Sequence, residues 1–276
     1  MSSTSSPHQD WVDLTHPLRS GMPVYPGDPC VRIAPALTLD DDGVAVQALT
    51  LGSHSGSHVD APAHLVSGGR TADHLRRDEL CGPALVLRLA GLQPREAISA
   101  ERLAALLPQH EVPVRVLLHT GWDRSFVPDD DAADVDDAEA RRRAHPVLSA
   151  EAAELLWQRG VRLLGVDTLS PDPTPAPDGP APDAFPAHEV FLGGDGIIVE
   201  NVAGLPALFD QSVADQSLVD PPQFDPTQHE ATRQAESDAA VVVELHIAPL
   251  LIADGDGAPA RIWARPLDPS PAAVNG

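Results

Sequence analysis

The chain has 276 residues, 42% of them hydrophobic, and its 18 basic and 41 acidic residues give a net charge of −23. Such a chain can bury a sizeable core, and its acidity argues against partners such as nucleic acid or an anionic membrane. It has no apolar run of the roughly 18 residues that a membrane-spanning helix needs. We expect a cytoplasmic protein that acts on a small molecule.

Strands and helices alternate along the predicted chain. Two helices should begin after the caps Ser99 and Ser149 and run to Leu107 and Arg159, and a shorter one is expected at 187–192. The first two strands have no helix between them, which suggests a hairpin added to the main sheet. The alternation predicts an α/β fold. Apolar, β-branched runs predict strands at 31–39, 44–51, 84–89, 114–118, 161–166, 197–199, 241–247 and 260–264.

Domain boundaries follow from composition. We expect a flexible N-terminus at 1–10, one domain over 11–268 and a flexible tail at 269–276. Three irregular, solvated insertions are expected inside the domain. They are the acidic segment 128–146, the segment 171–186 with its seven prolines, and the acidic, Gln-rich segment 210–238. The proline segment differs from the others because it leads directly to His188.

The segment from His54 to His64 carries the strongest chemical signal. Three histidines and an aspartate occupy even positions, and in an extended segment such positions share one face. His54, His58 and Asp60 are ligand types that bind a catalytic divalent metal and leave a coordination position open. His64 is close enough to move protons beside that metal.

Two other patterns are ambiguous on their own. His188 and Glu200 are separated by a predicted helix, a Gly-rich turn and a strand, which could bring the two side chains together. From spacing alone, a helix-surface histidine and a strand-end carboxylate are the better explanation. The segment 254–257, Asp-Gly-Asp-Gly, has the start of a calcium loop, but the ligand spacing fails at Ala258, so we interpret it as a turn.

Residues 54–64 resemble the signature His-x-Gly-Thr-His-x-Asp-x-Pro-x-His of the cyclase family of metal-dependent hydrolases, with Ser57 in place of threonine. That family includes bacterial kynurenine formamidase and isatin hydrolase. Segments 13–18, 24–28, 118–122, 165–170 and 188–201 are also similar to family elements. The resemblance implies a mixed β-sheet core with flanking helices, in a swivelling β/β/α-like architecture.

The resemblance also implies a ligand set. His54, His58 and Asp60 would bind a first metal, and Asp60 would bridge to a second held by His188 and Glu200. His64 would be the catalytic acid and base. Zinc and manganese, as one or two ions, both suit these nitrogen and oxygen ligands. The resemblance further implies a homodimer or a homotetramer.

The expected reaction is hydrolysis of a C–N amide bond by metal-activated water, in an N-formyl aromatic amine or a small cyclic amide. A lactone hydrolase or a ring-closing cyclase could use the same site, and a metal-dependent binding protein without turnover is the alternative from another class. Tyr25 stands where the formamidases have an aromatic substrate-wall residue. We expect it to bind substrate, and packing against the loop near Pro26 is the alternative.

Overall fold

The computed structural model describes residues 11–126, 135–209 and 237–267. The flexible ends expected at 1–10 and 269–276 lie outside these ranges, as do residues 128–134 and 210–236 of the two acidic segments. The eight predicted strands and three predicted helices fall within the described residues, and all of them are confirmed. Among those residues, no helix is both long and apolar enough to cross a membrane.

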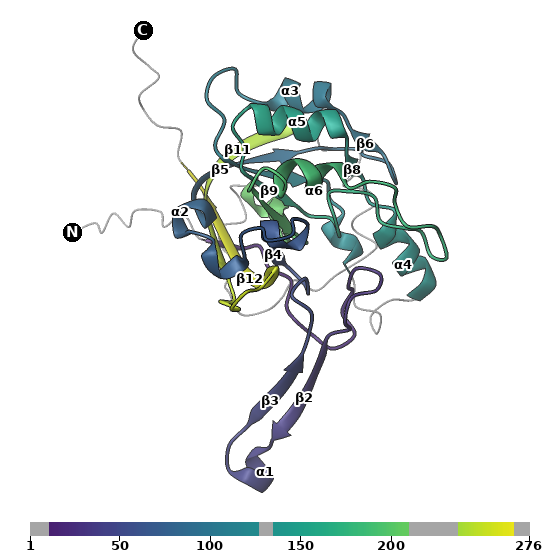
Figure 1. The fold of residues 1–276 in the computed structure, drawn as a ribbon, viewed down its shortest axis with the longest axis vertical. Coiled ribbons are helices and arrows are strands. Elements are labelled where there is room, and N and C mark those ends of the chain that lie inside the picture. The colour runs from purple at the N-terminus through teal and green to yellow at the C-terminus, as the bar shows by residue number, and fades with distance from the viewer. Residues whose placement is uncertain (1–10, 127–134, 210–236, 268–276) are drawn as a thin grey trace, which may run out of the picture.

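An eight-stranded mixed sheet forms the body of the protein (Figure 1). β4 pairs with both β10 and β12, so the strands from β12 round to β4 close into a ring. β5, β7, β9 and β10 are parallel, so their carboxyl ends meet at one edge. In spatial order the strands are β1 (Val12–Asp13), β12 (Gly257–Pro266), β11 (Ala239–Pro249), β5 (Cys81–Arg88), β7 (Arg115–His119), β9 (Leu163–Val166), β10 (Ile197–Glu200) and β4 (His58–Asp60).

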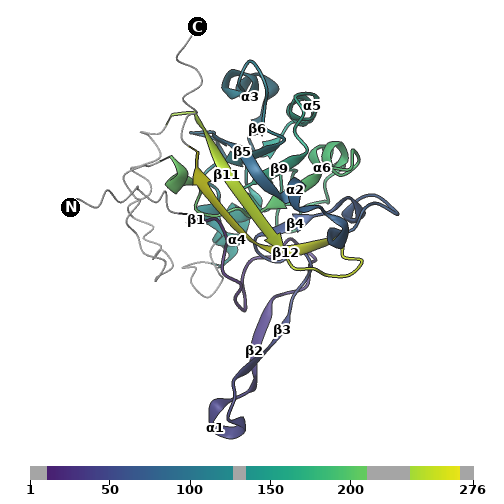
Figure 2. The ribbon, with the colours of Figure 1, turned by 90° about the vertical axis from the view of Figure 1, so that its left-hand side faces the viewer.

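Alternating apolar residues divide the core into two layers. Leu118, Leu164 and Ile198 face a cluster shared with α3 (Ala100–Leu106), α5 (Ala150–Gln158) and α6 (Pro186–Phe191), while Leu117 and Val199 face the second cluster. The three helices line up along one side of the sheet in Figure 2. As predicted, the hydroxyls of Ser99 and Ser149 accept hydrogen bonds from the first turns of α3 and α5.

The first two predicted strands form a hairpin, but it does not join the main sheet. β2 (Arg32–Leu37) and β3 (Val46–Thr50) make a separate two-stranded sheet with α1 (Leu39–Asp42) at its tip. We call residues 32–50 the arm; it projects away from the body in both views (Figures 1 and 2). The added-strand prediction is wrong because periodicity identifies a strand but not the sheet that it joins.

Part of the acidic insertion is also ordered. α4 (Val135–Arg143) contradicts the irregular structure expected there, and ion pairs four residues apart, Asp137–Arg141 and Glu139–Arg143, support the helix. Residues 171–185 have no regular structure, as expected, but the segment begins buried rather than solvated. The remaining short elements are β6 (Ala97–Ile98), β8 (Val147–Leu148), α2 (Arg77–Leu80) and the 3₁₀ helices η1 (Pro62–His64), η2 (Ala72–His74), η3 (Asp123–Ser125) and η5 (Leu205–Leu208).

Candidate metal centre

β4 is a short, fully buried strand that presents His58 and Asp60 on one face. The expectation of one extended segment from 54 to 64 is wrong outside β4. Gly56 has a φ of 67° in the turn before the strand, and Pro62 begins the 3₁₀ helix η1 after it. His54 and His64 therefore reach the cluster from a turn and from a helix.

His54 lies over the start of β12. Its Nδ1 is 2.6 Å from Oδ1 of Asp60, and its ring meets that of His58 edge to face. A Cβ added to Gly257 would come within 2.7 Å of Cε1 of His54. The glycine in that strand is therefore needed to let the ring approach.

His188 and Glu200 do join the cluster. Antiparallel pairing of β10 with β4 places Glu200 opposite His58, and α6 brings His188 above both. Nε2 of His188 is 3.8 Å from Oδ2 of Asp60 and 3.6 Å from Oε1 of Glu200. The other carboxylate oxygen of Glu200 lies 3.4 Å from Nε2 of His58.

The five side chains form two overlapping groups that share Asp60. One is His54, His58 and Asp60, the other Asp60, His188 and Glu200, and in each the ligand atoms lie within 4.8 Å of one another. Nε2 of His58, Oδ2 of Asp60 and Oε1 of Glu200 are buried and have no hydrogen-bond partner among the described residues. Buried polar atoms are normally paired. Orphaned atoms converging from both groups fit a pair of divalent ions.

The ring nitrogen of each histidine that points away from this centre has its own partner. Nδ1 of His58 donates to the carbonyl oxygen of Gly56 at 2.8 Å, and Nδ1 of His188 donates to Oδ2 of Asp172 at 2.7 Å. Nε2 of His54 lies 2.9 Å from Oδ2 of Asp256. Such outer contacts fix the tautomer and orientation of metal-binding imidazoles.

Asp172 and Asp256 are functional candidates that the sequence patterns do not predict. Asp172 lies in the proline segment, where it also accepts hydrogen bonds from the backbone N–H groups of Ala187 and His188 at the start of α6. That segment was noted only for leading to His188. Asp256 lies in the turn at 254–257. Because its spacing does not match a calcium loop, the sequence gives no reason to expect its contact with His54.

His64 stands at the open side of the cluster, with 36% of its side chain exposed. Its ring centroid is 4.0 Å from that of His54 and 5.9 Å from that of His188. Nδ1 of His64 is 3.4 Å from Oδ2 of Asp256, so it is the other ring nitrogen, Nε2, that can face a substrate. The position suits a residue that exchanges protons with a substrate above the ions.

Tyr25 is half-buried beside the same carboxylates. Burial is the main cause that raises the pKa of its hydroxyl, and the negative charges of Glu200, Asp28 and Asp172 raise it further. The phenol is therefore within electrostatic range of Glu200 and Asp172. It stays protonated near neutral pH and can donate a hydrogen bond.

The carboxylates of the centre stabilise positive charge beside them. Burial alone would lower the pKa of His54, but its hydrogen bond to Asp60 and the charge of Asp60 raise it to about 9. Burial opposes a charged His188 in the same way, and Asp172, Glu200 and Asp60 raise its pKa to about 8. Carboxylates that draw protons onto neighbouring imidazoles will also attract metal ions.

Comparisons with known proteins found a matching family model, similar sequences and similar structures. The cyclase family model matches residues 12–173. A kynurenine formamidase of Erythrobacter litoralis is 32% identical over 203 residues, which cover 73% of this chain and 85% of that protein. A kynurenine formamidase of Bacillus cereus is 28% identical over 259 residues, which cover 94% of this chain and 98% of that protein. The structure of isatin hydrolase A from Labrenzia aggregata superimposes with a TM-score of 0.66 at 20% identity, covering 92% of this chain and 93% of that one.

Proposed function

Because the chain belongs to the cyclase family and matches kynurenine formamidases, we propose that it is a metal-dependent amidohydrolase. Its substrate is an N-formyl aromatic amine or a small cyclic amide, and its C–N bond is cleaved by water. The observation that carries this proposal is the shared carboxylate of Asp60 between two groups of metal-ligand side chains.

The ligand roles follow from the two groups. His54, His58 and Asp60 would hold one divalent ion, zinc or manganese, and Asp60, His188 and Glu200 would hold a second. The two oxygens of Glu200 face different histidines, so this side chain could serve either ion. When bound, such ions lower the pKa of a coordinated water and polarise a carbonyl oxygen.

The remaining residues supply orientation and protons. Asp172, Asp256 and the Gly56 carbonyl keep the three imidazoles turned toward the centre. Nε2 of His64 takes a proton from the attacking water and passes it to the leaving nitrogen, while Asp256 accepts the hydrogen bond of Nδ1. Water adds its oxygen to the carbonyl carbon and its hydrogens leave with the products, so one amide and one water yield a carboxylic acid and an amine.

The presence of Tyr25 near the centre favours an aromatic or planar substrate. Its ring lies near the carboxylates of the centre, so it can flank a flat molecule whose amide reaches the ions. We propose that its hydroxyl makes one polar contact with the substrate and that its ring makes the stacking contact.

The test is a hydrolysis panel on the full chain, stripped with a chelator and reloaded separately with Zn²⁺ or Mn²⁺. N-formyl aromatic amines, cyclic amides and lactones are offered, and the acid and amine products are quantified by mass spectrometry. The proposal expects turnover of a formamide or cyclic amide that is lost on chelation and regained with metal. Turnover of lactones alone would reassign the reaction, and metal binding without any turnover would indicate a binding protein.

We also propose that the enzyme is a homodimer or a homotetramer and that it works in the cytoplasm. The arm supports self-association, because its large apolar side chains are exposed and an isolated two-stranded hairpin is only marginally stable in water. Those side chains are Leu37, Leu39, Val44, Val46 and Leu49. Both cysteines, Cys30 and Cys81, are free, which suits a reducing compartment.

A variant pair on the arm tests the oligomer. Val46→Asp places a charge on the exposed apolar surface, and Gln47→Asp places one on a neighbouring exposed polar position of the same strand. Light scattering after size exclusion should show an oligomer for the unchanged chain and for Gln47→Asp, but a smaller species for Val46→Asp. A monomeric unchanged chain would refute the proposal.

A further inference from the structure

A buried histidine outside the metal centre has no hydrogen-bond partner. His119 is the last residue of β7 and is 2% exposed, yet neither of its ring nitrogens is hydrogen-bonded among the residues that the structure describes. An unpaired buried polar group destabilises the folded state. The centre around Asp60 does not use this residue.

Two carboxylates lie beside His119. Asp167 directly follows β9, which runs parallel to β7, so both residues lie at the same edge of the sheet. Nε2 of His119 is 4.0 Å from Oδ2 of Asp167. Asp123, at the start of η3, completes a group whose three ligand atoms all lie within 4.8 Å of one another.

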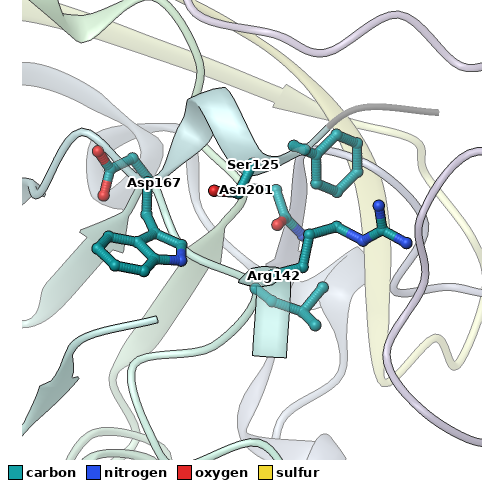
Figure 3. Close-up of a pocket in the computed structure, with 7 residues that line it drawn as sticks. Ser125, Arg142, Asp167 and Asn201 are labelled. Carbon is teal, nitrogen blue, oxygen red and sulfur yellow. The ribbon is translucent and has the colours of Figure 1, made fainter. Parts of the chain in front are cut away.

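Burial and neighbouring charges shift the pKa values of two members of this group. Burial, followed by the charge of Asp123, raises the pKa of Asp167 to about 7, although Thr120 and Gly121 donate hydrogen bonds to its carboxylate. Burial, followed by the positive charges of Arg124 and Arg88, lowers the pKa of His119 to about 3, which keeps the imidazole neutral, the form that binds metals. In Figure 3, Asp167 and Arg142 lie on opposite sides of the small pocket that they both line.

We propose that His119, Asp123 and Asp167 form a separate metal site that takes one divalent transition-metal ion, such as Zn²⁺ or Mn²⁺. One imidazole nitrogen and two carboxylates would bind it. Two ligands about 2.0–2.2 Å from one tetrahedral ion lie about 3.3–3.6 Å apart, so His119 and Asp167, which are 4.0 Å apart, would have to close by roughly half an ångström to share an ion. The 3.8 Å separation of His188 and Asp60 in the main centre is similar.

The ion would have a structural role. His119 ends β7, Asp167 follows β9, and Asp123 accepts a hydrogen bond from the backbone N–H of Gly204 at 3.4 Å. One ion would therefore tie together the segments that follow β7, β9 and β10. The β10 segment begins with Asn201, next to Glu200 of the main centre.

Counting ions tests the site independently of activity. The unchanged chain and variants are stripped with a chelator, dialysed against Zn²⁺ or Mn²⁺, and analysed for bound metal per chain. His119→Leu should bind one ion fewer than the unchanged chain. The matched control His74→Leu, at a position with 67% of its side chain exposed, should lose none.

A second background separates this site from the main centre. Asp60→Ala, which damages that centre, should retain one ion, and Asp60→Ala combined with His119→Leu should lose it. Asp123→Asn, at a half-buried position, gives the same test if His119→Leu does not fold. Equal metal content in the unchanged chain, His119→Leu and Asp123→Asn would overturn the proposal, whatever the panel of substrates shows.

Melting temperature provides a second readout. Without metal, His119→Leu should melt no lower than the unchanged chain, because leucine removes an unpaired buried imidazole. Added metal should then stabilise the Asp60→Ala chain, as binding to the folded state requires. It should not stabilise the combined variant; an equal rise in both would also overturn the proposal.

Discussion

Asp256 accepts a hydrogen bond from Nε2 of His54 at 2.9 Å across 202 residues of sequence, and the same oxygen lies 3.4 Å from Nδ1 of His64. A single carboxylate thus contacts a proposed ligand and the proposed acid. It brings the turn before β12 to the mouth of the centre. The pKa of Asp256 is about 2, because its hydrogen bonds to His54 and Ser53 outweigh the effect of partial burial.

Asp256→Asn should therefore weaken both metal binding and turnover. Loss of a carboxylate that orients a ligand typically costs about 10–100-fold in affinity or activity. The control is Asp254→Asn, two residues away in the same turn with an exposed side chain. Metal affinity and kcat are measured for both variants. Equal values for Asp256→Asn and Asp254→Asn would show that the contact with His54 is incidental.

Loss of a ligand should have a more severe effect. His54→Ala and Asp60→Ala each remove a proposed ligand, and Asp60 serves both ions, so metal content and activity should fall together. Elemental analysis and the substrate panel measure the two quantities. We expect Asp60→Ala to lose more metal than His54→Ala. Full metal and full activity in either variant would contradict the assignment.

His64→Asn should separate metal binding from catalysis. The side chain is partly exposed and is not assigned as a ligand, so metal content should stay unchanged. Turnover should fall by about 10²–10⁴, the usual contribution of a positioned acid or base. Loss of metal would make His64 a ligand, and unchanged turnover would remove its proposed role.

Local chemistry explains how much of this centre was predictable. His58 and Asp60 alternate on β4 as the spacing predicts, because the period of a strand depends only on the backbone. His54 and His64 reach the same place from a turn and from a 3₁₀ helix. The four side chains therefore lie together as predicted, although the extended conformation assumed for these two residues is wrong. Asp256 could not be predicted, because its contact depends on the pairing of β12 with β4.

The arm shows the same limit at the level of the fold. The apolar pattern of β2 and β3 predicts strands, and both exist. Whether strands join the main sheet depends on pairing partners far along the chain, which periodicity does not specify. α4 was missed for another reason: its helix is supported by charged pairs such as Asp137–Arg141 rather than by an apolar stripe.

Tyr25→Ala should affect substrate binding more than the chemical step. The ring lies beside the centre rather than among the ligands, so its removal should raise KM for an aromatic amide more than it lowers kcat. Tyr25→Phe keeps the ring and removes the hydroxyl, so it should retain most of the affinity. An unchanged KM in Tyr25→Ala would make Tyr25 a packing residue.

Buried neutral histidines should make the protein acid-sensitive. His145 donates through Nδ1 to the carbonyl oxygen of Pro146 and accepts at Nε2 from the hydroxyl of Thr174. Burial, only partly opposed by the bond to Pro146, lowers its pKa to about 4. An unfolded histidine titrates near 6.5. Between these values the unfolded chain binds the extra proton.

The free energy of unfolding should therefore be unaffected by His145 above about pH 6.5 and should decrease as the pH falls toward 4. One such group contributes up to about 1.4 kcal/mol per pH unit. His145→Gln has no titrating ring, so urea unfolding of metal-stripped protein should show a shallower decrease for it between pH 7 and 5. His16 and His119 are also buried with lowered pKa values, so the free energy of unfolding of His145→Gln should still decrease somewhat as the pH falls. Identical slopes for the two chains would mean that His145 takes up its proton without unfolding.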